Sequence, residues 1–324
     1  MSLFCFLLNT IKERYSMDFT GGITISGGIT VIPASGGGGS GNKAIFGYGD
    51  DNNALSMTNL VSNTGVVATD TAGVGTVRWG LAAAGYGADK AIFGYGLSAA
   101  FAALSLTNLV SNTGVVATDT AGVGTARREL AAAGYGTDKA IFGYGYTNVN
   151  VSITNLVSNT GVVATDTTGV GTARQALAAA GYGTDKAIFG YGTITSITNL
   201  VSNTGVVATN TAGVGTARRA LAAAGYGTDK AIFGYGLSGG STSYSLTNLV
   251  SNTGVVATDT AGVGTARYAL AAAGYGTDKA IFGYGYDGTT AFSLTNLVSN
   301  TGVVATDTSG VGTGRFYLAA AAYG

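Results

Sequence analysis

The chain has 324 residues, of which 55 are Gly and none is His, and its 16 basic residues balance 16 acidic ones. The absence of His excludes imidazole acid–base catalysis, Ser-His-Asp and Cys-His arrangements, and metal sites that contain His. A net charge of zero, with 10% charged residues, gives no sign of nucleic acid or of an anionic membrane as a partner.

Residues 1–18 are interpreted as an N-terminal extension, with Met17 as a second candidate start. The apolar run at residues 3–8 is followed, not preceded, by the charged residues 12–14, which makes it a poor secretory signal. No apolar run reaches the roughly 18 to 20 residues of a membrane-spanning helix. We therefore expect no membrane span, and the sequence leaves the localisation open.

Residues 19–42 carry two alternating Ile-Thr stretches followed by GGGGSGN. Such alternation predicts short strands, and the Gly/Ser run predicts a flexible linker. We interpret this segment as a small β arm plus linker that anchors the following domain to an assembly partner. The arrangement resembles accessory proteins of phage tails and virions.

From residue 43 onward the chain is a tandem repeat with spacings of 44 to 49 residues. Periods in this range indicate a propeller or a solenoid. The segment KAIFGYG begins six times, at Lys43, Lys90, Lys139, Lys186, Lys230 and Lys279. The segment TNLVSNTGVVAT also begins six times, at Thr58, Thr107, Thr154, Thr198, Thr247 and Thr295.

Each repeat contains four short segments rich in small, β-branched and aromatic residues. In one copy they are LAAAGYG at 221–227, KAIFGYG at 230–236, SLTNLVSN at 245–252 and GVVATDT at 254–260. Gly, Asn and Asp separate them, which predicts four antiparallel strands. The LAAA stretch also has helix propensity, but its short length and the Gly that follows favour a strand.

The order of the strands bears on the architecture. The first repeat lacks LAAAGYG and starts at Lys43, whereas the chain ends on an extra copy at residues 318–324. A ring closed by that C-terminal strand leaves no unpaired sheet edge, which a linear solenoid would have to cap. We therefore predict an all-β, six-bladed β-propeller of four-stranded antiparallel blades over residues 43–324, with the C-terminal strand joining the first blade.

The repeat resembles the kelch repeat, in which an Arg precedes a small-residue strand and an aliphatic strand ends in a glycine doublet. The matching residues in one copy are Arg218, 221–227 and 232–236, although the doublet is Gly-Tyr-Gly here. The resemblance implies a propeller whose first strands line a central channel, in a family dominated by protein-interaction modules. The copper site of its relative galactose oxidase needs His and Cys, so it does not carry over, and we expect no cofactor and no metal.

Charged residues recur with the period of the repeat, which favours a structural use over a single asymmetric active site. An acidic position, Asp in five repeats, is Asn210 in the fourth. We expect these groups to make turn hydrogen bonds and contacts between blades, and the alternative is a ring of Arg at a channel mouth that attracts an anion. The repeated Arg residues are Arg78, Arg127, Arg174, Arg218, Arg267 and Arg315.

The repeats diverge in two places, the loop after KAIFGYG and the pair of residues after each repeated Arg. In antiparallel blades both places emerge on one face, which is typical of a recognition surface on a rigid scaffold. Neutral drift in tolerant loops is the alternative. The candidate binding residues on this face are Asp50, Asp51, Asn52, Trp79, Phe101, Tyr146, Asn148, Tyr244, Tyr268, Tyr286, Asp287, Phe292 and Phe316.

Aromatic anchors beside short polar acceptors suit a protein epitope or a sugar ring. The leading hypothesis is a non-enzymatic propeller that binds a protein or a glycan through its variable face, as a virion or cell-surface component. The rival is a glycosidase or lyase that uses Asp or Tyr. The unrepeated acidic residues available to it are chiefly Asp50, Asp51, Glu129 and Asp287.

Overall fold

The structure, a computed structural model, describes residues 41–324, which fall in the second of two compact units, Ala34–Gly324. The expectations for residues 1–18 and for the β arm up to residue 40 lie outside the described residues. Residues 41–324 form strands and turns, as an all-β fold requires. Within them no helix could cross a membrane.

The strands assemble into six small antiparallel sheets, each with a first, a second and a third strand. The first strands are β4 (Ala82–Tyr86), β7 (Ala131–Tyr135), β10 (Ala178–Tyr182), β13 (Ala222–Tyr226), β16 (Ala271–Tyr275) and β19 (Ala319–Tyr323). The second are β1 (Lys43–Asp50), β5 (Lys90–Ser98), β8 (Lys139–Tyr146), β11 (Lys186–Gly190), β14 (Lys230–Leu237) and β17 (Lys279–Gly283). The third are β2 (Ala54–Val61), β6 (Ala103–Val110), β9 (Asn150–Val157), β12 (Thr198–Val201), β15 (Ser243–Val250) and β18 (Thr295–Val298).

The prediction of four strands per sheet is wrong. The GVVATDT segment runs antiparallel to the third strand but forms no continuous ladder with it. It pairs at isolated bridges, such as Val61 with Val67 and Thr58 with Thr71, and the N–H of Ala68 donates to the carbonyl of Leu60 at 2.8 Å. Between these bridges the buried side chain of Asn59 donates to the carbonyl of Ala68 at 3.0 Å. A side-chain amide thus takes the place of ladder hydrogen bonds. One sheet has a fourth member, the two-residue β3 (Arg78–Trp79), which pairs with β5.

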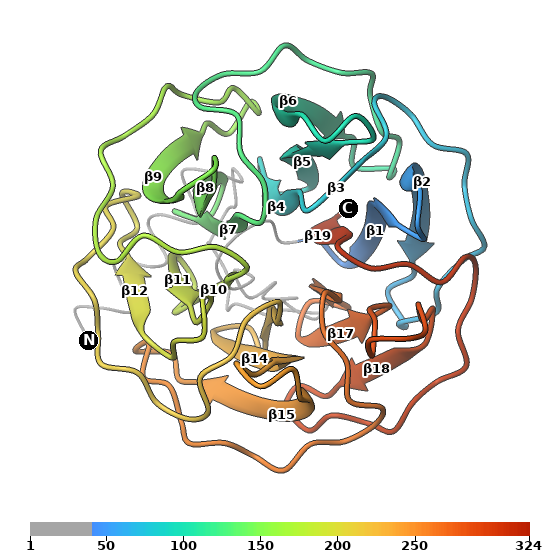
Figure 1. The fold of residues 1–324 in the computed structure, drawn as a ribbon, viewed down its shortest axis with the longest axis vertical. Coiled ribbons are helices and arrows are strands. Elements are labelled where there is room, and N and C mark those ends of the chain that lie inside the picture. Colours follow the sequence, from blue (N-terminus) through green and yellow to red (C-terminus); the bar gives the residue numbers. More distant parts are fainter. Residues whose placement is uncertain (1–40) are drawn as a thin grey trace, which may run out of the picture. The chain divides into compact units, whose positions relative to one another are not determined.

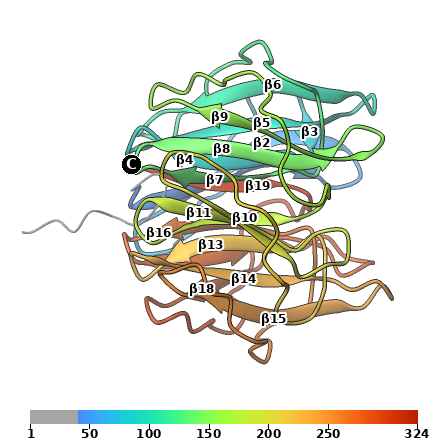
Figure 2. The ribbon, with the colours of Figure 1, turned by 90° about the vertical axis from the view of Figure 1, so that its left-hand side faces the viewer.

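The last strand pairs with the first sheet. Strand β19 lies antiparallel to β1, with Lys43 opposite Tyr323 and Gly47 opposite Ala319. The first strands contact one another in the order β4, β7, β10, β13, β16 and β19, and β19 in turn contacts β4. In Figure 1 the third strands lie farther from the centre of this unit than the first strands, and connecting segments run outside them; Figure 2 gives the perpendicular view.

Neighbouring sheets pack through a Gly and a Phe of KAIFGYG. A Cβ added to Gly47 would lie 2.7 Å from Cζ of Phe93 in the next sheet, so this close approach requires Gly. The ring of Tyr48 lies 5.1 Å from that of Phe93, a geometry that adds about 0.5–1.5 kcal/mol beyond area burial. The contact recurs between the sixth and first sheets, where Phe46 lies against Gly283.

The Gly-Tyr-Gly segment forms a bulge in four of the second strands. In the first, Tyr48 itself has a φ of 64° and Gly49 one of 109°, and the pairing with β2 shifts between Gly47 and Gly49. The bulge leaves the Tyr48 ring wholly buried between two sheets. The pattern of Gly alone does not reveal this, because the left-handed conformation begins at the aromatic residue.

Candidate functional site

Each repeat buries its Arg completely, with an exposed fraction of 0% for all six. In Arg127, Nε donates to the carbonyl of Tyr144 at 2.8 Å, and Nη2 donates to Oδ1 of Asn155 at 2.7 Å. The guanidinium also lies 4.3 Å from the ring centroid of Tyr95. The alternative of an anion-attracting Arg ring at a channel mouth is wrong, because solvent does not reach these groups.

The repeated acidic position connects neighbouring repeats. Asp119 accepts hydrogen bonds from the backbone N–H of Thr76 at 3.0 Å and from its hydroxyl at 2.6 Å. In the fourth repeat Asn210 preserves the connection, since its Oδ1 accepts from the N–H of Thr172 at 3.1 Å and its Nδ2 donates to the Thr172 hydroxyl at 2.7 Å. The repeated charges therefore serve packing between repeats.

Six residues, one per repeat, are joined by main-chain hydrogen bonds in a cycle that we call the peptide ring. The N–H of Glu129 donates to the carbonyl of Gly80 at 2.7 Å, and the N–H of Gly80 donates to the carbonyl of Tyr317 at 2.8 Å. All six have a left-handed φ between 50° and 61°, which hydrogen bonding holds in place against its steric cost. The ring consists of Gly80, Glu129, Ala176, Ala220, Ala269 and Tyr317.

The peptide ring lines a cavity of about 110 Å³, which we call the ring cavity. The rest of its wall is made by the Leu and Ala residues at the start of the first strands, such as Leu81 and Ala82. Glu129 is the one charged residue among its lining residues in the described part of the chain. The volume is below that of pockets enclosing a drug-sized ligand, so the cavity suits the end of a ligand.

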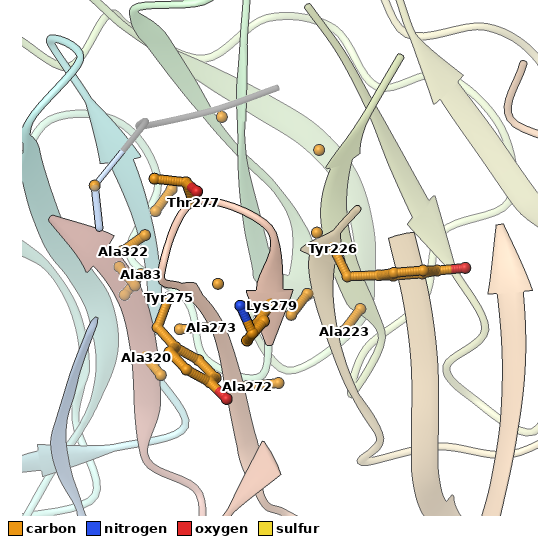
Figure 3. Close-up of a pocket in the computed structure, with 18 of the residues that line it drawn as sticks. Ala83, Ala223, Tyr226, Ala272, Ala273, Tyr275, Thr277, Lys279, Ala320 and Ala322 are labelled. Carbon is orange, nitrogen blue, oxygen red and sulfur yellow. The ribbon is translucent and has the colours of Figure 1, made fainter. Parts of the chain in front are cut away.

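A second cavity of about 100 Å³, the lysine cavity, opens along the same strands and shares alanines such as Ala83 and Ala223 with the ring cavity. Figure 3 shows Lys279 and Thr277 among the small side chains that line it. Lys279 pairs at 2.8 Å with the preceding residue, Asp278. The same Asp-Lys pairing occurs in four other repeats, so this end lacks an asymmetric set of groups.

Aromatic residues flank the peptide ring on one side, and we call them the aromatic arc. Neighbouring ring centroids are 4.7 to 5.7 Å apart along the whole series. The closest pair is Tyr286 and Phe316, which are stacked. In order of contact the arc is Trp79, Tyr317, Phe316, Tyr286 and Tyr268.

The other half of the surround carries polar residues, which we call the polar arc: Arg128, Glu129, Gln175 and Arg219. Nε of Arg128 lies 3.7 Å from Oε1 of Glu129 and makes no hydrogen bond within residues 41–324, although it is buried. The buried Oε1 of Gln175 also lacks a hydrogen-bond partner there. The polar arc therefore holds unused hydrogen-bonding capacity.

The ionisable groups of the ring cavity are strongly perturbed. Burial raises the pKa of the Glu129 carboxyl, and Arg128 and Arg219 partly offset this rise. Burial also raises the pKa of the Tyr317 hydroxyl to about 12, with a further contribution from Glu129. Arg128 and Arg219 oppose the rise at Tyr317 as well. Both guanidinium groups thus lie within electrostatic reach of the ring cavity.

The structure brings five of the sequence-predicted binding residues to this site. Trp79, Tyr268, Tyr286 and Phe316 belong to the aromatic arc, and Tyr146 lies under the guanidinium of Arg128 at 4.8 Å. The two divergent regions adjoin in each repeat through short pairings such as Tyr268 with Tyr286. Asp50 joins the site only through its backbone, which pairs with that of Phe316.

The remaining predicted residues lie outside both arcs, in loops except for Tyr244, which lies in β15. Phe101 is 77% exposed, and Asn52 and Asn148 occupy exposed left-handed turn positions. Asp287 accepts hydrogen bonds from the backbones of Thr289 and Thr290 and so serves its own turn. Three others, neither exposed nor in an arc, are Asp51, Tyr244 and Phe292.

The list of candidate binding residues omitted Tyr317, Arg128, Arg219, Gln175 and Glu129. All lie in the divergent pairs after the repeated Arg, so the signal was present. The second member of each pair was not recognised as a lining residue, because the peptide ring depends on left-handed φ values at residues other than Gly.

No family model matches the chain, and no curated protein matches it. The kelch resemblance therefore rests on the residues of the repeat alone.

Proposed function

We propose that residues 43–324 form a kelch-like, six-bladed β-propeller whose ring is completed by β19. Three observations support it: the pairing of β19 with β1, the cyclic order of contacts among the first strands, and the main-chain hydrogen bonds of the peptide ring. On this proposal the ring cavity and the lysine cavity are the two ends of one central channel.

We further propose that the protein is a non-enzymatic binding module that recognises a saccharide at the ring cavity. The observation that carries this is the two-sided surround, with the aromatic arc facing residues of the polar arc across the peptide ring. Aromatic faces pack against the C–H face of a pyranose, while Arg, Gln and Glu exchange hydrogen bonds with its hydroxyl groups. The small cavity suits the terminal unit of a chain.

A protein partner is the second candidate, because aromatic residues and Arg also dominate protein interfaces. Phe101 and Val149, which are 77% and 65% exposed, would extend such an interface outward from the arcs. A glycosidase normally requires two carboxylates flanking the bond that breaks, and Glu129 is the only carboxylate among the described lining residues. A virion or cell-surface placement depends on residues 1–42 and stays a prediction.

The test is a glycan array with the full chain, followed by calorimetric titration of the best saccharide. We expect Trp79→Ala to weaken binding about tenfold, the loss of roughly 1.4 kcal/mol of stacking. Val162→Ala, which shortens an exposed apolar residue in a uniform turn, is the matched control and should bind normally. Hydrolysis or elimination of the saccharide would contradict the non-enzymatic proposal, and an empty array would contradict saccharide recognition.

A further inference from the structure

We propose that the saccharide is anionic and that Arg128 and Arg219 bind its acidic substituent. This inference rests on the proposed function and deepens it, because it names the ligand class that the polar arc selects. The substituent is a carboxylate or a sulfate, since either presents the paired oxygens that a guanidinium fork binds.

The first support is the state of Arg219. Within residues 41–324 its side chain has no ion pair, hydrogen bond or aromatic contact, in contrast to Arg218 beside it, which is wholly buried and makes three side-chain hydrogen bonds. A guanidinium presents five N–H donors. The N–H donors of the Arg219 side chain are therefore unused among the described residues, although its charge acts on Glu129 and Tyr317. At this position the other repeats carry Trp, Gln, Tyr or Phe, or Arg in the second repeat.

The second support is convergence. Arg128 and Arg219 come from different repeats, yet both lower the pKa of the same two groups, Glu129 and Tyr317. Glu129 and Tyr317 both line the ring cavity. The two guanidinium groups thus both act electrostatically on residues that line one cavity, where their fields add.

The third support is the poor pairing of Arg128. Its Nε stands 3.7 Å from Glu129, beyond hydrogen-bond distance, and is buried without a partner in the described part of the chain. Counting Glu129 against the two cations, the polar arc keeps a charge of +1 when Glu129 is ionised. An anionic substituent that displaces Glu129 from Arg128 would supply the missing acceptor.

This arrangement predicts a pH dependence. Glu129 faces Arg128 from its own repeat, Arg219 and Tyr317 from others, and the uncharged Gly80 and Ala176 on either side in the peptide ring. Because the pKa of Glu129 is raised, lowering the pH neutralises it earlier than an ordinary Glu, and the polar arc moves from +1 to +2. Affinity for an anionic saccharide should therefore rise as the pH falls toward that pKa.

The experiment compares three oligosaccharides that share one backbone: neutral, carboxylated and sulfated. The full chain is titrated with each at neutral and mildly acidic pH. We expect the anionic forms to bind at least about tenfold more tightly than the neutral form, as for one hydrogen bond to a charged group. The sulfated form stays charged at all pH values, so the pH dependence of its binding reflects titration of Glu129 and not of the ligand. Comparison with the carboxylated form at neutral pH shows which substituent is preferred.

Variants locate the effect. Arg219→Gln should reduce binding of the anionic forms about tenfold or more and binding of the neutral form much less, because a Gln amide can still exchange hydrogen bonds with a hydroxyl group but carries no charge. Glu129→Gln should strengthen binding of both anionic forms at neutral pH and remove the pH dependence of binding of the sulfated form. Lys139→Gln removes one positive charge at the start of β8, where Lys139 pairs with Asp138 of the preceding uniform turn, and is the matched control. Melting curves for each variant verify the fold, to which Arg219 contributes main-chain hydrogen bonds with Leu237 but no side-chain hydrogen bond or ion pair among the described residues.

The outcomes separate the two proposals. Equal binding of neutral and anionic forms, or an unchanged preference in Arg219→Gln, would overturn the assignment of an anionic ligand and leave saccharide recognition standing. Failure of all three oligosaccharides, together with an empty array, would overturn both. A charge preference lost equally in Lys139→Gln would show a general field of the protein and would also refute the site.

Discussion

Arg78 and Arg127 occupy the same position in successive repeats and differ by one hydrogen bond. Nε of Arg127 donates to the carbonyl of Tyr144, whereas Nε of Arg78 is buried without a partner among the described residues. Their other contacts match closely, with the guanidinium 4.1 Å and 4.3 Å from the Tyr rings beneath. Comparing Arg78 with Arg127 therefore measures how much one hydrogen bond from a buried Nε contributes to the free energy of unfolding.

We expect Arg127→Lys to lower the free energy of unfolding by about 3 kcal/mol or more, because Lys lacks the fork that reaches several acceptors. Arg78→Lys should lower the free energy of unfolding by about 1.5 kcal/mol less than Arg127→Lys does, because it breaks one hydrogen bond fewer. Urea unfolding at neutral pH measures both. Equal losses in the two variants would show that the Nε hydrogen bond contributes nothing net.

The sequence predicts the roles of some residues and not of others. Repetition marked Arg127 and Asp119 as structural, and the structure places both in contacts between repeats. The same regularity could not show that Arg127 is inaccessible, because burial of a cation depends on acceptors such as the Asn155 side chain, 28 residues away along the chain. Glu129 and Tyr317 were missed because side-chain direction there follows from a left-handed backbone.

At the scale of the element, alternation and turn residues predicted three strands per repeat correctly and the fourth wrongly. GVVATDT has the composition of a strand, and its neighbour β2 offers an edge. The buried Asn59 decides the outcome, since its amide bonds to both Ala68 and Asp70 across the gap. Composition measures local preference, whereas a ladder also needs its partner's main-chain groups to be free.

Contacts between sheets depend on the absence of a side chain at one position in each second strand. A Cβ on Gly143 would lie 2.6 Å from Cζ of Phe189, which is wholly buried. We expect Gly143→Ala to destabilise the protein by about 1–3 kcal/mol through overpacking. Gly240→Ala is the matched control, because only the tip of Ser238 lies near its added Cβ. Similar melting temperatures for both variants would refute close packing at Gly143.

At the scale of the whole molecule, the two ends of the described chain meet in one sheet. The N–H of Asn42 donates to the carbonyl of Gly324 at 3.0 Å, and β19 packs beside both β16 and β4. The orphan LAAAAYG copy at the C-terminus signalled this pairing in the sequence. The peptide ring gave no such signal, because it is built from main-chain groups.

Removal of residues 318–324 should lower the denaturation midpoint of the whole described unit in one transition, since it exposes an edge of β1 and leaves a gap between β16 and β4. A chain in which the same seven residues are moved ahead of Asn42 through a short linker should recover most of the loss. Circular dichroism during thermal melting checks both. An unchanged transition after truncation would contradict completion of the ring by β19.

The peptide ring has a consequence for how many copies of the repeat the protein can carry. Its hydrogen bonds join six residues with nearly equal φ values, so a cycle of five or seven would need a different curvature at every joint. On the proposed fold a chain with one copy more or fewer could not close this cycle with the same φ values. Main-chain geometry in the peptide ring thereby fixes the number of repeats at six, whereas the loop sequences can vary without breaking the ring.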